Sequence, residues 1–111
     1  MGYNIIFYKD HRGRSPVKSF LDDLQTLAKT QKRSKQLFKK IVLYIEILKR
    51  IGSRSGLPYT RHISNGIWEL RPNNYRIFFF IWNGNHIVLL HLFHKKTNKT
   101  PISEIKRAET E

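Results

Sequence analysis

The spacing of apolar residues predicts two amphipathic helices in the first half of the chain. Ser15 has the side chain of a helix N-cap, and Pro16 suits the first helical position. Apolar residues at helical spacing then predict a helix that ends near Lys29: Val17, Phe20, Leu21, Leu24, Leu27 and Ala28. The polar, basic segment 30–36 is expected to join it to a second, antiparallel helix. That helix is defined by Leu37, Phe38, Ile41, Val42, Ile45, Leu48 and Ile51, with Gly52 as its stop.

Runs rich in β-branched and aromatic residues predict strands in the rest of the chain. The predicted strands are residues 3–8, 67–71, 75–82 and 86–93, with 59–63 either a short strand or an ordered approach to one. Asn65-Gly66 and Asn83-Gly84-Asn85 are turn signals between them. A basic connector, 95–99, leads to a short helix that starts at Thr100 and Pro101 and ends near Glu109.

This order of elements predicts the α+β class and one domain over residues 1–111. Two N-terminal helices are expected to pack on an antiparallel sheet, mixed only through its first strand, with a short C-terminal helix. Internal repeats and low-complexity tracts are absent from the sequence, and a hydrophobic fraction of 40% argues against disorder.

Charge narrows the choice of partners. The chain holds 21 Lys and Arg against 8 Asp and Glu, a net charge of +13. Such an excess favours a polyanionic partner, whether RNA, DNA, the ribosome surface or an acidic protein. The alternative is a basic domain without such a partner. The chain has no cysteine, which excludes a disulfide scaffold and a thiolate zinc site and fits a cytoplasmic protein. A signal peptide and a membrane span are not expected.

Candidate chemistry lies where the predicted strands end. Arg71 and Arg76 stand on the two sides of a tight turn, and Lys95 and Lys96 follow the last strand. Metal-dependent nucleases need clustered oxygen ligands, and Glu69 is the only acid of this region, so neither a metal nor another cofactor is expected.

The histidines of the last strand offer little for paired catalysis. Alternation predicts His86, Val88, Leu90, Leu92 and His94 on one strand face, with His91 on the other. His86 and His94 would then be too far apart to act on one phosphate, and His91 is expected in a core or surface role.

The cations instead suit a phosphate that is attacked by the 2′-hydroxyl of its own RNA. Arg71, Arg76, Lys95 and Lys96 would stabilise charge on the phosphorane, and Glu69, His94 or a lysine of lowered pKa would accept the proton. Tyr75 would stack on a base. Arg61, Lys99, Lys39 and Lys40 are further candidate RNA contacts; the alternative for the basic helix face is simple solvation.

The succession of these segments resembles the RelE/ParE superfamily of type II toxins, closest to its phage-derived, HigB-like branch. The segments are Leu57-Pro58-Tyr59-Thr60, Gly66-Ile67-Trp68-Glu69-Leu70-Arg71, Tyr75-Arg76-Ile77-Phe78, the run from Leu89 through His94-Lys95-Lys96-Thr97, and Thr100-Pro101. The family's strand arginine falls on Arg76, a second cation on Arg71, and the basic residues after the last strand on Lys95 and Lys96. His94 matches a histidine of HigB-like members. Glu69 stands where several relatives have a basic residue, and no tyrosine follows the last strand.

The resemblance implies a RelE-like fold and a toxin that cuts mRNA on the ribosome without a metal, leaving a 2′,3′-cyclic phosphate and a 5′-hydroxyl. It implies growth arrest through inhibited translation, and a HigA-like helix-turn-helix antitoxin that contacts operator DNA. Two alternative functions stay open. ParE-like relatives share the fold but inhibit DNA gyrase by binding, and a non-catalytic nucleic-acid-binding domain is the other.

Overall fold

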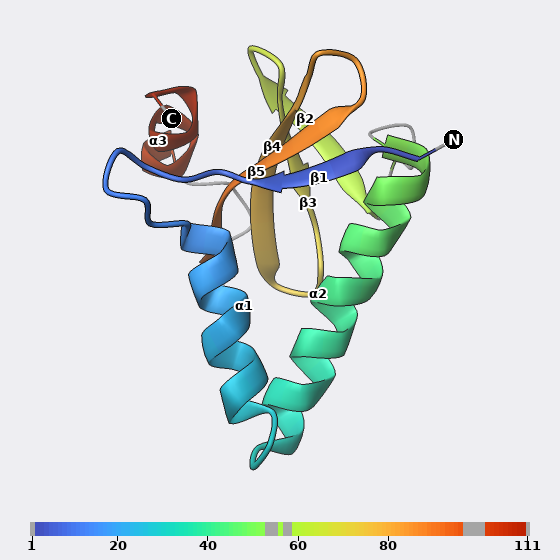
Figure 1. Ribbon diagram of the computed structural model, residues 1–111, viewed down its shortest axis with the longest axis vertical. Helices are drawn as coiled ribbons and strands as arrows, with labels where there is room; N and C mark the ends of the chain where they lie inside the picture. Colours follow the sequence, from blue (N-terminus) through green and yellow to red (C-terminus); the bar gives the residue numbers. More distant parts are fainter. Residues whose placement is uncertain (1, 53–55, 57–58, 97–101, 111) are drawn as a thin grey trace.

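The computed structural model of the protein describes residues 2–52, 56, 59–96 and 102–110. Within these ranges the chain forms a five-stranded mixed sheet and three helices, the α+β arrangement expected from the sequence (Figure 1). The elements are β1 (Asn4–Phe7), α1 (Pro16–Leu27), α2 (Lys32–Ile51), β2 (Thr60–Ser64), β3 (Ile67–Leu70), β4 (Tyr75–Trp82), β5 (His86–His94) and α3 (Ile102–Thr110).

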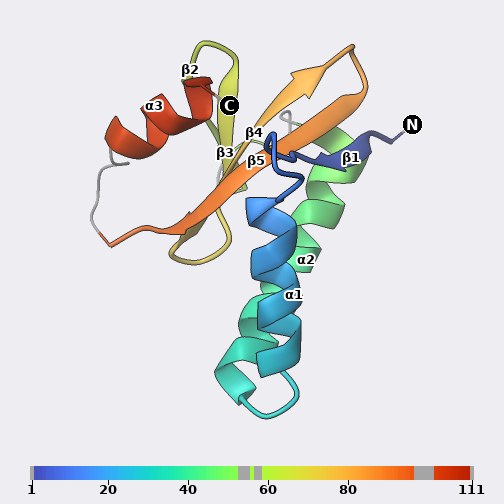
Figure 2. The same cartoon turned by 60° about the vertical axis from the view of Figure 1, so that its left-hand side comes forward.

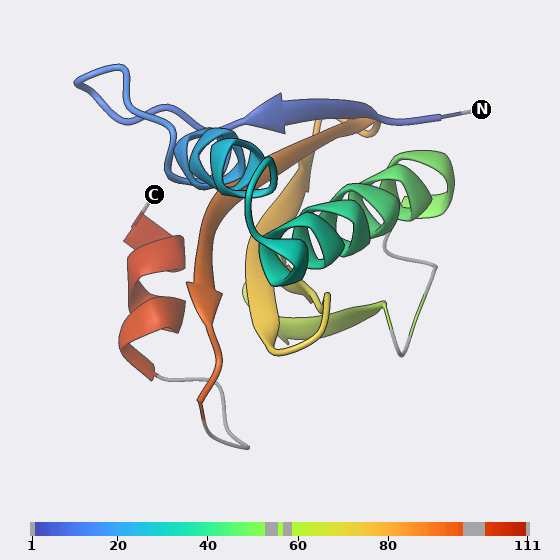
Figure 3. The same ribbon diagram turned by 90° about the horizontal axis from the view of Figure 1, so that it is seen from below.

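The strands lie side by side in the order β1-β5-β4-β3-β2. β1 pairs with β5 in parallel, with Asn4 opposite His86, and every other pair is antiparallel. The helical hairpin of α1 and α2 packs on one face of this sheet, and α3 lies on the other (Figures 2 and 3).

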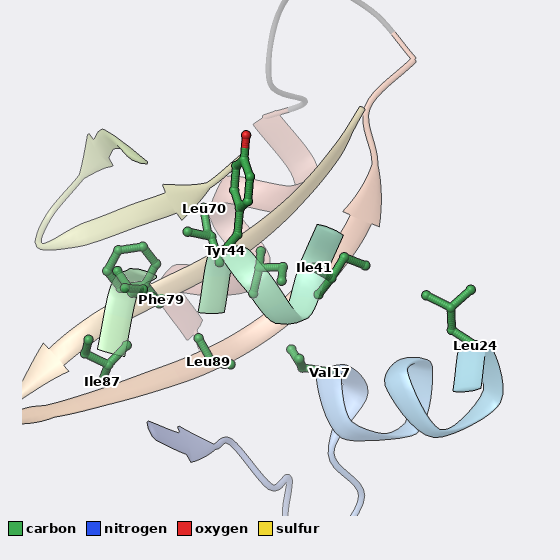
Figure 4. Packing of buried hydrophobic residues seen from close by; sticks show 10 residues of the cluster. Val17, Leu24, Ile41, Tyr44, Leu70, Phe79, Ile87 and Leu89 are labelled. Carbon is green, nitrogen blue, oxygen red and sulfur yellow. The ribbon is translucent and has the colours of Figure 1, made fainter. Parts of the chain in front are cut away.

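The main core lies between the sheet and the helical hairpin. Ile41 and Leu48 of α2 and Val17 of α1 are fully buried against the inward side chains of β4 and β5, among them Phe79 and Leu89 (Figure 4). The helical periodicity of the sequence identified these positions correctly, because one apolar stripe of each helix faces the sheet.

A smaller core lies beneath α3. Ala108 and Ile105 pack on Phe78, Val88 and Leu90 from the opposite sheet face. The imidazole of His91, fully buried, lies with its Nε2 3.3 Å from the Glu104 carboxylate of α3. His91 is thus a core residue, one of the two roles, core or surface, that the sequence predicted.

Local signals set the helix ends. The Ser15 hydroxyl accepts a hydrogen bond from the Lys18 backbone N–H at 3.3 Å, and Pro16 opens α1, so the predicted cap is confirmed. The expected connector 30–36 is wrong in part, since α2 already begins at Lys32. Its first turns extend beyond the sheet and need no apolar stripe, so periodicity failed to mark them. The expected loop 53–58 lies largely outside the described residues, as do Lys99 and the helix start at Thr100 and Pro101.

A register shift between β4 and β5 overturns the predicted strand face. Phe78 lies opposite His91, whereas Phe79 lies opposite Leu89, so Leu90 is an additional residue in β5. Such a bulge reverses the alternation of side chains. Val88 and Leu90 face α3, while Leu92 packs with the helical hairpin. His86, Val88, Leu90, Leu92 and His94 therefore do not share one face.

Gly52 ends α2 as the sequence predicted. Its φ of +62° and ψ of −154° lie in a region that other residues rarely adopt. A Cβ at this position would lie 2.7 Å from the Tyr3 ring, which packs against the main core. Glycine is thus required both by the backbone and by the close ring.

Gly52→Ala is expected to destabilise the fold by about 2 kcal/mol or more, because backbone strain and the clash with Tyr3 add. Gly13→Ala is the matched control, since Gly13 also has positive φ (+77°) but nothing within 4 Å of its added Cβ. Thermal unfolding of both variants measures the difference. Equal losses for the two would show that the Tyr3 contact is unimportant.

Candidate functional site

The strand ends gather the cations that the sequence singled out. Tyr75 begins β4 opposite His94 at the end of β5, and the Lys95 N–H donates to the Asn74 carbonyl at 2.6 Å. The Arg71 N–H donates to the Tyr59 carbonyl at 2.9 Å, fixing the end of β3 against the approach to β2. The turn between β3 and β4 and the end of β5 are thus fixed by backbone hydrogen bonds.

A single carboxylate organises two of these cations. Glu69 is fully buried, and its Oε2 lies 3.7 Å from Arg76 Nε and 3.8 Å from Arg71 Nη1. These distances are those of ion pairs rather than of short hydrogen bonds. Because one buried carboxylate contacts both guanidinium groups, Glu69 is placed to position the two arginines.

The guanidinium of Arg76 is held from several sides. Its Nη1 donates to the carbonyls of Asn73 (2.9 Å) and Tyr75 (2.7 Å), while Nε faces Glu69. Asn73 reaches this position in the left-handed region, at φ +54°. Arg76 is only 7% exposed, and its burial lowers the pKa of the guanidinium, with Glu69 opposing. Among the described residues, no hydrogen-bond partner of Nη2 is found.

Two more cations belong to the same cluster. Arg61 on β2 lies opposite Glu69 in the sheet register, and its charge acts on both Arg76 and Lys95. Burial lowers the pKa of the Lys95 ammonium, and the charges of Arg76, Arg71 and Arg61 lower it further, against Glu69. We call Arg61, Arg71, Arg76, Lys95 and Glu69 the strand-end cluster.

The aromatic candidates lie on the opposite face of the sheet. Tyr75 follows the alternation of Ile77, which packs with the helical hairpin. The Tyr75 ring stacks on His94, with centroids 4.8 Å apart and an interplanar angle of 28°, and contacts Phe20 of α1 at 5.6 Å. His94 is exposed. The strand ends therefore offer cations on one face and a stacked ring pair on the other.

The other predicted contacts are dispersed. Lys96 is exposed beside Lys95, whereas Lys39 and Lys40 belong to α2. The Lys40 ammonium lies 5.3 Å from the centre of the Tyr44 ring, a cation–π distance. The structure therefore does not bring Lys39 and Lys40 into the strand-end cluster, and Lys99 lies outside the described residues.

The strand-end cluster has the donors that an anionic phosphate needs. Guanidinium groups bind phosphate oxygens in a fork, and a partly desolvated ammonium supplies a point charge. In the part of the chain that the structure describes, no three His, Cys, Asp or Glu side chains come together as a metal site, and no helix is long and apolar enough to span a membrane.

Glu69→Gln is expected to destabilise the fold by about 3–5 kcal/mol, because it leaves buried Arg76 without its counter-ion. Glu46→Gln, which neutralises an exposed glutamate of α2, should change stability by less than about 0.5 kcal/mol. Chemical denaturation of both variants gives the comparison. A Glu69→Gln protein as stable as the wild type would mean that the ion pairs do not hold the arginines.

Comparison with known proteins is consistent with this arrangement. No curated protein matches the chain. The family model described as "Phage derived protein Gp49-like (DUF891)" matches residues 22–111, which include α2, the whole antiparallel part of the sheet, the strand-end cluster and α3. This family is associated with RelE-like and other toxin-like proteins. The chain belongs to the Gp49-like family of phage-derived proteins.

Proposed function

We propose that this protein is the toxin of a type II toxin–antitoxin pair, a HigB-like endoribonuclease that cuts mRNA on the ribosome without a metal. The observation that carries the proposal is the strand-end cluster, in which buried Glu69 holds Arg71 and Arg76 beside Lys95. Membership of the Gp49-like family and the net charge of +13 support it.

The chemistry uses the nucleophile that RNA itself carries. The 2′-oxygen attacks the adjacent phosphorus while the bond from phosphorus to the 5′-oxygen breaks, which gives a 2′,3′-cyclic phosphate and a 5′-hydroxyl. Arg71 and the Nη2 group of Arg76 stabilise the charge that develops on the phosphorane oxygens. Because both guanidinium groups are held in advance, little reorganisation is needed in the transition state.

Lys95 is the best-placed acceptor for the 2′-hydroxyl proton. Burial and the neighbouring arginines lower its pKa, so its neutral amine is populated at a lower pH than that of a free lysine. Glu69 is committed to the arginines, and His94 stacks on Tyr75. Tyr75 and His94 offer a stacking surface for a base next to the cut. The proton on the leaving 5′-oxygen comes from water in this scheme.

A HigA-like helix-turn-helix antitoxin is the proposed partner, which would link the toxin to operator DNA indirectly. The exposed apolar side chains Val42 and Leu43 of α2 are 37% and 54% exposed and would lose water on binding an antitoxin helix. A target on the ribosome places the toxin in the cytoplasm.

Arg76→Lys is expected to reduce mRNA cleavage by at least about 100-fold, because lysine keeps the charge beside Glu69 but loses the guanidinium fork. Lysine is preferred to alanine here since an uncharged residue would leave the Glu69 carboxylate buried without its closest cation. Arg50→Lys on the exposed face of α2 is the matched control and should cleave like the wild type. Primer extension on a defined mRNA, with and without ribosomes, measures the cuts.

Cuts by wild type that require ribosomes and weaken only in Arg76→Lys support the proposal. Absence of cuts with folded wild-type protein would refute the nuclease. A gyrase supercoiling assay on the same preparation then tests the ParE-like alternative, and inhibition there would reassign the toxin.

Lys95→Arg tests the proton acceptor. If neutral Lys95 takes the proton, the single-turnover cleavage rate of the wild type rises with pH and levels off above the lowered pKa of Lys95. Arginine stays protonated across this range, so the variant should be slow and lack that rise. The same pH profile in both proteins would exclude Lys95 from proton transfer.

A further inference from the structure

A lysine-rimmed groove lies at the turn of the helical hairpin, away from the strand-end cluster. Its volume is about 520 Å³, and its lining includes Lys29, Lys32, Lys35 and Lys39 together with Thr30 and Gln31. Figure 1 shows this turn as the end of the molecule farthest from the sheet. We call it the hairpin groove.

The placement of these lysines is expected to destabilise the fold when no anion is bound. A helix N-terminus carries partial positive charge and prefers acids, but the first turn of α2 has no acid and holds Lys32 and Arg33. Among the described residues, none of the four lysines forms an ion pair, whereas Lys18 of α1 pairs with Asp22. A bound polyanion would relieve the electrostatic repulsion among four ammonium groups that surround one concavity.

The residues that line the hairpin groove indicate which class of polyanion it fits, an acidic protein or a nucleic acid. Its side chains are cationic or polar, with Ala28 as the apolar exception among those that line it. The centre of a protein interface is normally built on aromatic and large apolar anchors. A basic groove without such anchors is typical of surfaces that follow a nucleic-acid backbone.

Helix α1 leads from the hairpin groove to the Tyr75–His94 ring pair beside the strand-end cluster. Phe20 of α1 contacts Tyr75, which stacks on His94. From Phe20 to the end of α1 at Leu27 the helical rise is roughly 10 Å, a span of a few nucleotides. The β3–β4 turn and the hairpin turn both extend toward the same end of the molecule (Figures 1 and 2). A single strand with a base stacked on Tyr75 and His94, which adjoin Arg76 and Lys95 in the chain, can therefore continue along α1 to the groove.

We infer that the hairpin groove binds the phosphate backbone of the same single-stranded RNA that enters the strand-end cluster, a few nucleotides from the cut. This inference rests on the proposed function. It assigns to Lys29, Lys32, Lys35 and Lys39 a role in holding the strand, separate from the chemistry at Arg76.

Three double variants that remove the same charge test it. Lys32→Gln/Lys35→Gln changes the hairpin groove, Arg71→Gln/Lys95→Gln changes the strand-end cluster, and Lys49→Gln/Arg50→Gln changes the exposed C-terminal turn of α2 as control. The probes are 2′-O-methyl RNAs, which cannot be cut, of about four and about sixteen nucleotides. Fluorescence anisotropy gives affinity at several salt concentrations, and thermal melts confirm that each variant is folded.

The groove variant should lose about tenfold in affinity for the long RNA, and its salt slope should fall by roughly 1.4, since each phosphate contact on a single strand contributes about 0.7. Its affinity for the short RNA should match that of the control variant. The cluster variant should weaken on both RNAs.

Equal losses in the groove and control variants would overturn the inference, because they would reflect diffuse charge. So would a groove variant whose affinity for the long RNA equals that of the wild type. Failure of the proposed function has a different signature, in which the cluster variant binds the short RNA as tightly as the wild type.

Discussion

The burial of one carboxylate among the cations of the strand ends is the constraint on which this structure depends. Without Glu69, the guanidinium of Arg76 would lie almost fully desolvated next to Arg71, Arg61 and Lys95 with no opposing charge. With it, two arginines are fixed in place while a net positive site is kept. An excess of fixed positive charge is what a phosphate requires and what a folded core otherwise avoids.

The sheet determines on which of its faces each charged side chain lies. Strand alternation sends Glu69 and Arg76 to the face that α3 covers and Tyr75 to the face of the helical hairpin. The bulge at Leu90 then brings His94 beside Tyr75. The cations and the stacked rings are thus on opposite faces of the sheet at the same strand ends, an arrangement that suits the proposed binding of a phosphate and its neighbouring base.

Much of this arrangement could be predicted from the sequence. Periodicity located both helices, and turn residues located the hairpins, because these signals are local. The start of α2 was missed since its first five residues, 32–36, are all polar or charged and show no apolar periodicity. The bulge was missed because a single extra residue leaves no trace in the pattern of apolar residues. The burial of Glu69 and the membership of Arg61 depend on cross-strand register, which the sequence does not specify.

The central claim is that RNA phosphate binds at the strand-end cluster, and side-chain NMR tests it most directly. Titration of the ¹⁵N-labelled protein with an uncleavable 2′-O-methyl RNA should shift the Nε–H signals of Arg71 and Arg76 and the ammonium signal of Lys95. Arg12, exposed before α1, should remain unshifted. Unshifted Arg71, Arg76 and Lys95 under saturating RNA would contradict the account.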